Sequence, residues 1–285
     1  MMSKNITKVI IVGAGRSGTN MLRDLLVKLP NCTTWNCDEI NPIWKFGNKD
    51  RPDDELVPLD ANERICRFIN SRFDKIAQRN NCEIVIEKTC ANSLRVPFVY
   101  KVVPDAKFIF ITRDGRDVVA SAMQRWVSKL DITYTLKKLQ YVPIQDLFHY
   151  VIHFSKIRLK RFLMGESVLS SWGPVYKGMD LDKKIMGLHE LCAKQWSKCV
   201  ESTTKGFAEI PADQMIHIKY EEFVLEPATY LKRIAEFIYD KDDFHSVSFD
   251  LITQEVKTSS VGSYKKVLSS TELVQIQSYL KASPR

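Results

Sequence analysis

Continuous apolar runs alternate along the chain with stretches in which apolar residues recur at helical spacing. The runs are rich in β-branched residues and predict buried strands at 8–13, 83–87, 107–112 and 215–220. The periodic stretches predict helices at 20–29, 61–79, 117–126 and 227–238. Weaker patterns predict a short strand at 33–36, a loop at 41–60, and a helix at 93–103 that Pro97 starts or kinks.

Strands that alternate with amphipathic helices indicate an α/β fold, with a central parallel sheet flanked by helices and a P-loop-like first turn. The 285 residues suffice for one large domain or two small ones, and we interpret 1–285 as a single domain. The stretch from about 127 to 205 leaves this rhythm, because it is long, helical in pattern and rich in aromatic residues. We interpret it as a helical insertion that covers the ligand edge of the sheet.

The first turn, Val12-Gly13-Ala14-Gly15-Arg16-Ser17-Gly18-Thr19-Asn20, is rich in glycine and leads from a strand into a helix. Such a unit presents backbone N–H groups and a helix N-terminus to an anion. A P-loop kinase or NTPase requires Lys where Thr19 stands, and Asp114 is the nearest candidate for a Mg²⁺ ligand. A dinucleotide site requires an acid about 20 residues on, where Asp38 and Glu39 lie, but the polar residues of this turn fit a pyrophosphate poorly.

Arg16-Ser17-Gly18-Thr19 resembles the 5′-phosphosulfate loop of sulfotransferases, enzymes that use 3′-phosphoadenosine 5′-phosphosulfate (PAPS). The resemblance implies that PAPS is the co-substrate, that no metal is required, and that Arg16 faces the bridging oxygen of the sulfuryl leaving group. It also implies that one 5′-phosphate binds to the loop residues Gly15, Arg16, Ser17, Gly18, Thr19 and Asn20.

A second strand–helix unit carries Arg113 at the strand end and Ser121 eight residues later. The pair matches, in type and spacing, the residues with which sulfotransferases hold the 3′-phosphate. A forked cation and a hydroxyl form charge-assisted hydrogen bonds worth roughly 1.5–3 kcal/mol each. The alternative is a surface cluster of salt bridges among Arg113, Asp114, Arg116 and Asp117, which the first loop makes less attractive.

Three further segments extend the resemblance. Ile86-Glu87-Lys88-Thr89 resembles a segment of heparan sulfotransferases, which implies that Lys88 contacts the transferring sulfuryl group; a strand-end lysine in solvent is the alternative. Lys219-Tyr220-Glu221-Glu222 resembles the end of a later family strand and implies that Tyr220 lies at the nucleotide. The segment 260–266 resembles the loop that closes over the nucleotide, so Lys265 or Lys266 is a candidate phosphate ligand, with a solvated lysine pair as the alternative.

Transfer to a hydroxyl group requires a base for the proton of the acceptor. Cytosolic small-molecule sulfotransferases carry a histidine where Cys90 stands, whereas tyrosylprotein and heparan sulfotransferases use a glutamate after the second strand. That resemblance assigns the base to Glu39, with Asp38 second; an acidic loop that caps a turn is the alternative. Trp35 and Trp44 are candidates for the apolar surroundings that would raise the pKa of the base.

The resemblance therefore implies in-line transfer of a sulfuryl group, with Glu39 as base and with Arg16 and Lys88 stabilising the charge. The acceptor carries a hydroxyl group: a carbohydrate, a peptide tyrosine, a lipid or a metabolite. Trp172-Gly173-Pro174, within the insertion, is a candidate wall of the acceptor pocket, with core packing as the alternative. A kinase or NTPase and a non-catalytic nucleotide-binding module remain the competing functions.

Composition narrows this picture. The formal net charge of +8 suits an anionic ligand, and no run of basic residues predicts nucleic-acid binding. Seven scattered cysteines without metal-ligand spacing indicate reduced thiols and a cytoplasmic location. We expect neither a signal peptide nor a membrane span, because no apolar run approaches the ~18 residues that a span requires. The oligomeric state stays open.

Overall fold

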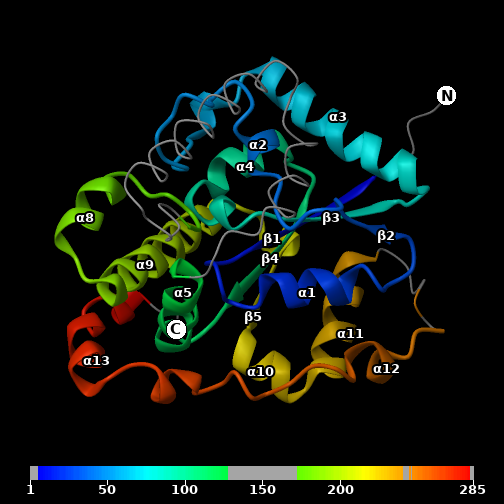
Figure 1. Cartoon of the computed structure of the whole chain (residues 1–285). Coiled ribbons are helices and arrows are strands. Elements are labelled where there is room, and N and C mark those ends of the chain that lie inside the picture. Colours follow the sequence, from blue (N-terminus) through cyan, green and yellow to red (C-terminus); the bar gives the residue numbers. More distant parts are fainter. Residues whose placement is uncertain (1–5, 128–171, 240–243, 245, 283–285) are drawn as a thin grey trace.

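The computed structural model of the chain describes residues 6–127, 172–239, 244 and 246–282. Within these residues five strands form one sheet in the order β2-β3-β1-β4-β5, and every neighbouring pair is parallel. The strands are β1 (Thr7–Val12), β2 (Cys32–Thr33), β3 (Ile84–Lys88), β4 (Lys107–Thr112) and β5 (Met215–Lys219). Helices cover both faces of the sheet (Figure 1), which confirms the predicted α/β architecture.

The continuous apolar runs are explained by burial on both faces. Along β1, Ile10 and Val12 pack into one hydrophobic core, whereas Val9 and Ile11 pack into the core on the opposite face. All four side chains are fully buried. A strand buried on both sides needs no polar positions, so its sequence shows no alternation.

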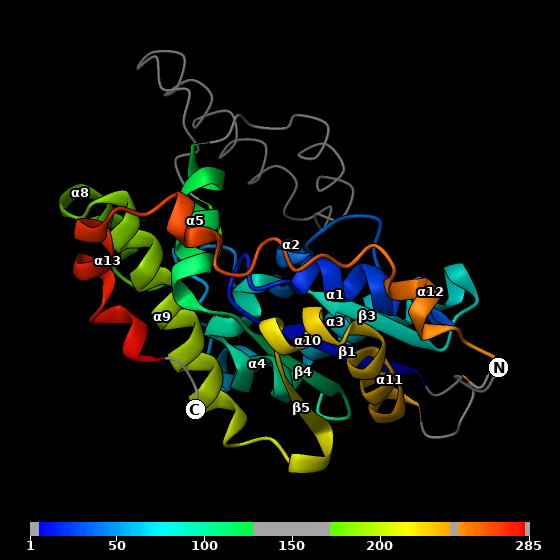
Figure 2. The same cartoon turned by 90° about the horizontal axis from the view of Figure 1, so that it is seen from below.

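Each face of the sheet has its own set of helices. One face packs against α1 (Thr19–Leu26), α10 (Tyr220–Leu225), α11 (Pro227–Ile238) and α12 (Phe249–Thr253). The other face packs against α2 (Asn41–Trp44), α3 (Glu63–Asn80), α4 (Val96–Val102) and the end of α9 (Leu188–Phe207). A third apolar cluster joins α5 (Gly115–Trp126), α8 (Met179–Ile185), α9 and α13 (Ser270–Ile276), which gather at one end of the molecule in Figure 2.

The predicted elements agree with the structure except in details. The predicted helix at 93–103 divides into a 3-10 segment, Cys90–Leu94, and α4, in which Pro97 is an early residue. The loop predicted at 41–60 contains the short helix α2, and the short second strand lies at Cys32–Thr33 rather than 33–36. Of the predicted insertion at 127–205, residues 128–171 lie outside the described part of the chain.

The parallel strands bring their carboxyl ends to a single edge of the sheet. β1 is the central strand, and its Ile11 lies in register with Lys88 at the end of β3 and with Ile109 in β4. The loops that follow β1, β3, β4 and β5 therefore meet at this edge, where open parallel sheets bind their ligands. Among the described helices, none is long and apolar enough to cross a membrane.

Candidate active site

The loop 13–18 joins β1 to α1 through a sharp bend. Arg16 and Gly18 have φ angles of 71° and 92°, in the left-handed region that residues with a side chain rarely adopt. A Cβ atom on Gly18 would lie 2.4 Å from the ring of Tyr220, and one on Gly13 would lie 2.6 Å from the carbonyl oxygen of Ile111. The glycines therefore let the backbone pass close to β4 and to Tyr220.

The loop leads directly into the N-terminus of α1. This end has no side-chain cap and no acidic residue in its first turn. The first N–H groups of a helix have no partner within the helix, and the helix dipole favours an anion there. Ser17 and Thr19 beside them are buried, at 1% and 3% exposure. The arrangement suits a phosphate bound by backbone amides and hydroxyl groups.

Two arginines and a serine meet beside the loop. Arg16 Nε donates to Ser121 Oγ at 2.9 Å, and Arg113 Nη1 donates to the carbonyl oxygen of Arg16 at 3.1 Å. The Arg113 guanidinium lies over the ring of Tyr220, 4.5 Å from its centroid. Its Nε is buried and has no hydrogen-bond partner among the described residues. Arg113 therefore keeps one donor free at the loop.

Positive charge accumulates at this point. The pKa of Arg16 is lowered, first by partial desolvation and then by the like charges of Arg125 and Arg113. Like charges held this close are relieved when an anion binds between them. The loop side of the sheet edge is thus built for a multiply charged anion.

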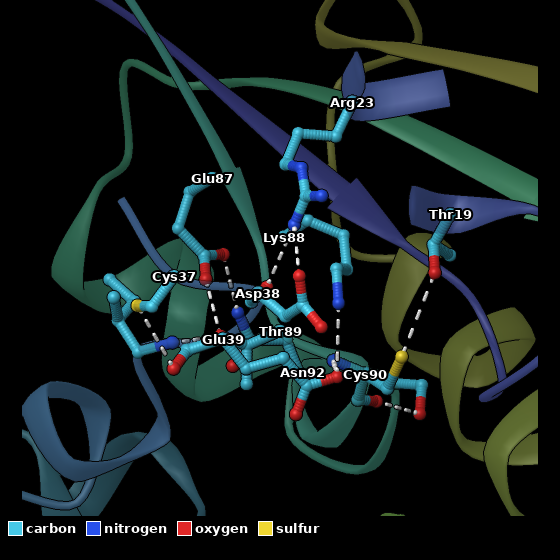
Figure 3. A network of polar contacts seen from close by, with 12 residues as sticks. Thr19, Arg23, Cys37, Asp38, Glu39, Glu87, Lys88, Thr89, Cys90 and Asn92 are labelled. Atoms are coloured by element: carbon cyan, nitrogen blue, oxygen red, sulfur yellow. Dashed lines mark hydrogen bonds and ion pairs between the residues drawn. The ribbon is translucent and has the colours of Figure 1, made fainter. Parts of the chain in front are cut away.

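A second group of side chains lies at the end of β3 (Figure 3). Lys88 Nζ donates to Glu39 Oε1 at 3.1 Å, and the backbone N–H of Cys90 donates to the same oxygen at 3.3 Å. Lys88 is only 4% exposed. Burial opposes its charge, but Glu39 outweighs burial, so the pKa of Lys88 lies above its usual value. The amine is therefore held as an ammonium group against a carboxylate.

The two acidic candidates, Asp38 and Glu39, point to different partners. Asp38 pairs with Arg23 at 3.4 Å, and Arg23 also binds Asp24. The side chain of Asp38 is 41% exposed, against 23% for that of Glu39. The structure therefore brings Glu39 to Lys88 and directs Asp38 toward α1.

A buried polar network lies beneath Lys88. Glu87 is fully buried, and its carboxylate accepts from Thr89 Oγ1 at 2.5 Å and from Asn92 Nδ2 at 2.9 Å. Burial raises the pKa of Glu87 to about 7. Thr89 Oγ1 in turn accepts from the backbone N–H of Ile40 at 3.2 Å. The network thus links the end of β3 to the loop that carries Glu39.

Cys90 faces the first loop. Its Sγ lies 3.7 Å from Thr19 Oγ1, so the end of β3 contacts the beginning of α1 directly. Burial raises the pKa of the Cys90 thiol to about 12, which keeps it protonated at neutral pH. The thiol is therefore neither a base nor a nucleophile in this setting.

Comparison with known proteins decides the family. A sequence profile of the Sulfotransferase family matches residues 8–163, more than half of the chain. The chain belongs to the sulfotransferase family. No curated protein matches its sequence.

Solved sulfotransferase structures share the fold. The sulfotransferase domain from the curacin biosynthetic pathway has a TM-score of 0.54 and 12% identity, over 99% of this chain and all of that one (100%). A sulfotransferase from Mycobacterium tuberculosis H37Rv has a TM-score of 0.53 and 11% identity, over 99% of this chain and 78% of that one. The sulfotransferase domain of the Synechococcus PCC 7002 olefin synthase has a TM-score of 0.51 and 11% identity, over 100% of this chain and 98% of that one.

In this sulfotransferase most of the predicted site residues meet at the carboxyl edge of the sheet. The loop 15–20, Arg113, Ser121 and Tyr220 lie on one side, and Lys88 with Glu39 on the other. Lys265 and Lys266 are exposed in the 3-10 segment Ser263–Lys266. Among the described residues no cluster of three His, Cys, Asp or Glu side chains could hold a metal ion.

The tryptophans named from the sequence have different surroundings. The ring of Trp172 lies against the first loop, because a Cβ atom on Gly15 would be 3.0 Å from it. Gln195 Nε2 fixes this segment by donating to the carbonyl oxygens of Trp172 and Pro174, at 2.9 and 2.8 Å. Trp35 and Trp44 instead pack edge-to-face against Phe73 in the hydrophobic core.

Sequence reasoning missed several members of this sulfotransferase site. Asn92 and Ser260 were assigned no role, although Ser260 receives a hydrogen bond from Arg113. Glu87 was noted only as the residue before Lys88. Its complete burial, rather than its identity, sets it apart, and periodicity cannot distinguish a strand-end carboxylate in water from one in the core.

A cavity of about 740 Å³ opens on the far side of the β4–α5 turn. It is lined by Arg116, Trp196, Tyr264 and residues of α13, and it includes no residue of the first loop and neither Lys88 nor Glu39. Arg113 also lines the hollow, so the turn 113–116 is a wall that the hollow shares with the loop side of the site.

Proposed function

We propose that the protein transfers a sulfuryl group from PAPS to a hydroxyl group of an acceptor by in-line displacement. The observation that carries the proposal is the Lys88–Glu39 pair, 3.1 Å apart, next to the phosphate-binding loop. Because Lys88 lies in register with Ile11 of β1, its ammonium group sits beside the strand that leads into that loop. A cation and a base are thus held where a group bound by the loop would react.

The donor nucleotide fits the loop side of the sheet edge. The 5′-phosphate would bind the amides and hydroxyl groups of Gly15, Arg16, Ser17, Gly18, Thr19 and Asn20. The 3′-phosphate would bind Arg113, whose Nε lacks a partner, and Ser121, whose hydroxyl already accepts from Arg16. Tyr220, which stacks on Arg113, would border the nucleotide. Lys265 and Lys266, which are exposed, would be further candidate ligands for a phosphate.

The transfer step divides between Glu39 and the cations. Glu39 removes the proton of the acceptor hydroxyl, whose oxygen forms a bond to sulfur. The bond between sulfur and the bridging oxygen breaks, and its electrons remain on the 5′-phosphate of the leaving 3′-phosphoadenosine 5′-phosphate (PAP). Arg16 and Lys88 stabilise the charge that develops there. Glu39 becomes available as a base when Lys88 turns from it to the sulfuryl oxygens.

The ion pair explains why such a base would stay unprotonated before substrate binds. An ammonium group 3.1 Å away favours the carboxylate form of Glu39 over the protonated form. Once Lys88 engages the sulfuryl oxygens, Glu39 loses part of this stabilisation and becomes more basic. The same residue pair would therefore couple donor binding to acceptor deprotonation.

The acceptor is a molecule with a hydroxyl group, and a carbohydrate, a peptide tyrosine, a lipid and a metabolite all satisfy this chemistry. Trp172 lies against Gly15 and supplies a flat apolar surface at the loop. It is the described residue best placed to border an acceptor there. A cytoplasmic location fits seven cysteines, none of which is in a disulfide.

Calorimetric titration with PAP, ATP and NAD, on the wild type and on Arg113→Ala, tests the proposal. We expect tight binding of PAP alone and a loss of roughly tenfold to a hundredfold in Arg113→Ala, because charge-assisted hydrogen bonds are lost. The matched control is Arg116→Ala, which removes a guanidinium that pairs with Asp114 and leaves the loop intact. Binding of ATP or NAD instead, or equal binding of PAP by Arg113→Ala, would overturn the proposal.

A nucleotide-binding module without chemistry would pass that titration. Incubation of the bound protein with radiolabelled PAPS and a panel of phenols, sugars and peptides separates the two cases. Labelled product that disappears in Glu39→Gln supports the transferase. Retained PAP binding without transfer to any acceptor favours the module.

A further inference from the structure

The segment 260–264 contacts the proposed nucleotide site from far along the sequence. It leaves α12, and in Figure 2 the chain between α12 and α13 reaches the first turn of α5. Ser260 lies inside the site: its carbonyl oxygen accepts from Arg113 Nη2, and its hydroxyl bonds to the hydroxyl of Tyr220. The position of Ser260 thus depends on what holds this segment in place.

Asp117 is the residue that holds it. Its carboxylate accepts from the backbone N–H of Gly262 at 2.8 Å, the backbone N–H of Tyr264 at 2.9 Å and Ser263 Oγ at 3.2 Å. Asp117 is 1% exposed, so these bonds form away from water. Gly262 has a φ angle of 70°, a left-handed turn that directs the chain around the carboxylate. Three donors converge on one buried side chain.

The carboxylate of Asp117 lies close to Arg113, where a negative charge opposes phosphate binding. Its Oδ2 lies 4.0 Å from Arg113 Nη2, so a negative charge stands next to the guanidinium proposed to hold the 3′-phosphate. By electrostatics alone, this carboxylate would repel the phosphate and weaken binding. A buried carboxylate at this place is therefore best explained by the segment that it fixes.

We propose that Asp117 is a positioning residue that fixes residues 260–264 against Arg113 and thereby raises the affinity of the site for the 3′-phosphate. This inference rests on the proposed function, because it assigns the 3′-phosphate to Arg113. Asp117 touches no substrate and acts through Ser260, which it holds against Arg113 and Tyr220. Residues 260–264 are then part of the nucleotide site even without a cation of their own.

The matched pair of variants is Asp117→Asn and Asp114→Asn. Each removes one negative charge from the first residues around α5, but Asp114 pairs with Arg116 and accepts nothing from 260–264. Asparagine at 117 has one acceptor oxygen and turns an N–H group toward one of the three donors. Ser263→Ala is the milder variant, because it removes a single bond of a half-buried hydroxyl and leaves the fold intact.

The first readout is amide hydrogen exchange of Gly262 and Tyr264 in the free protein. We expect both amides to exchange at least roughly tenfold faster in Asp117→Asn, because the acceptor that protects them is impaired. In Asp114→Asn they should keep their wild-type rates. Unchanged exchange in Asp117→Asn would show that the carboxylate does not fix the segment, and it would overturn the inference.

The second readout is the affinity for PAP compared with adenosine 5′-phosphate, which lacks the 3′-phosphate. We expect Asp117→Asn to bind PAP at least roughly tenfold more weakly and adenosine 5′-phosphate with less than about threefold change. Ser263→Ala should lie between the wild type and Asp117→Asn. Asp114→Asn should bind PAP as tightly as the wild type or more tightly, because the substitution removes a negative charge that repels the phosphates.

The direction in which Asp117→Asn changes the affinity for PAP decides between the outcomes. If the wild type binds PAP and Asp117→Asn binds it equally or more tightly, electrostatics governs and the role of Asp117 is overturned, while the proposed function stands. If the wild type does not distinguish PAP from adenosine 5′-phosphate, the proposed function fails. Equal weakening of both ligands in Asp117→Asn indicates general damage to the site and overturns the specific role.

Discussion

The two sides of the sheet edge are built in different ways. The loop side relies on backbone geometry and on a surplus of cations: left-handed residues at 16 and 18, a helix N-terminus, and arginines that crowd one another. The β3 side is an ion pair above a polar network, with Lys88 at 4% and Glu87 at 0% exposure. One side resembles a receptor for an anion, and the other holds a few groups rigidly in place.

This difference indicates a division of work. Cations and amides around a ligand determine affinity, whereas a buried, hydrogen-bonded network fixes orientation to within the tolerance that chemistry requires. Substitutions on the loop side should therefore change the binding of PAP, and substitutions on the β3 side should change the rate of transfer. The predictions below challenge that separation, beginning with the largest expected effect.

Glu39→Gln should produce the largest loss. Glutamine keeps the size and can still accept from Cys90 N–H, but it cannot take the proton of the acceptor. We expect kcat to fall about 10²–10⁴-fold, the usual contribution of a general base. PAP affinity should change by less than about tenfold, because the residue lies on the β3 side. Transfer from radiolabelled PAPS and calorimetry measure the two quantities.

Asp38→Asn is the comparison for that experiment. Asp38 pairs with Arg23 and does not contact Lys88 among the described residues, so its loss should leave kcat within about threefold of wild type. The reverse result, with the large loss in Asp38→Asn, would move the base to Asp38 and remove Glu39 from the mechanism.

Gly18→Ala should disrupt the loop side, lowering both stability and PAP binding. The added Cβ would lie 2.4 Å from the Tyr220 ring, and the alanine would have to adopt a φ angle of 92°. Backbone strain and overpacking together should lower the free energy of unfolding by about 2–4 kcal/mol and abolish tight PAP binding. Urea denaturation and PAP titration measure both effects.

Gly178→Ala isolates the contribution of strain in that prediction. Gly178 has nearly the same backbone conformation, with a φ angle of 89°, but no atom lies within 4 Å of its added Cβ. Gly178→Ala should lower the free energy of unfolding by about 1–2 kcal/mol and leave PAP binding unchanged. If Gly178→Ala were as destabilising as Gly18→Ala, then close approach to Tyr220 would not explain the glycine.

Glu87 gives the β3 side a pH signature. Its pKa is raised to about 7 from 4.5, chiefly by burial, so between these values the folded protein keeps a proton that the unfolded chain releases. The free energy of unfolding should therefore fall as pH rises from about 4.5 through about 7, by up to about 3 kcal/mol from this group. Above that range the loss is complete.

Glu87→Gln tests this by removing the titration while keeping the side-chain shape. Denaturant titrations at several pH values should show that the difference in stability between variant and wild type grows in favour of the variant from pH ~5 to ~8. Glu209→Gln, at an exposed carboxylate, should show no such trend. A pH-independent difference at position 87 would mean that Glu87 is already ionised in the folded protein.

The sequence was sufficient for most of the scaffold because the central strands β1 and β4 contain continuous apolar runs. β4 and α11 lie where the pattern placed them, at Lys107–Thr112 and Pro227–Ile238. The expectation that the loops after the strands gather at one edge followed from the parallel sheet, although the direct contact of Arg16 with Ser121 was not predicted. These predictions depended on local periodicity and on topology, both of which a single sequence carries.

Other parts of the site have no local signal. Asp117 contacts residues 145 and more positions away, and nothing in the sequence of either segment indicates the pairing. The choice between Asp38 and Glu39 depends on the direction of the backbone after β2, which is only two residues long. Lys265 and Lys266 are exposed, and their role as phosphate ligands stays a prediction.

Trp172 should give the smallest effect, and it lies at the boundary between the two sides. Its ring touches Gly15 of the loop, while its segment is tied to the β3 side through Val175 N–H, which donates to Asp54 at 2.9 Å. It is half-buried, whereas Trp35, Trp44, Trp126 and Trp196 are at most 5% exposed. PAP binding should therefore change the intrinsic fluorescence mainly through Trp172, and Trp172→Phe should abolish the change while altering stability by about 1 kcal/mol or less.

Trp126→Phe should retain the signal, since Trp126 lies in the cluster behind α5. A signal that survives in Trp172→Phe would place the responding tryptophan elsewhere and would leave Trp172 with the acceptor side alone.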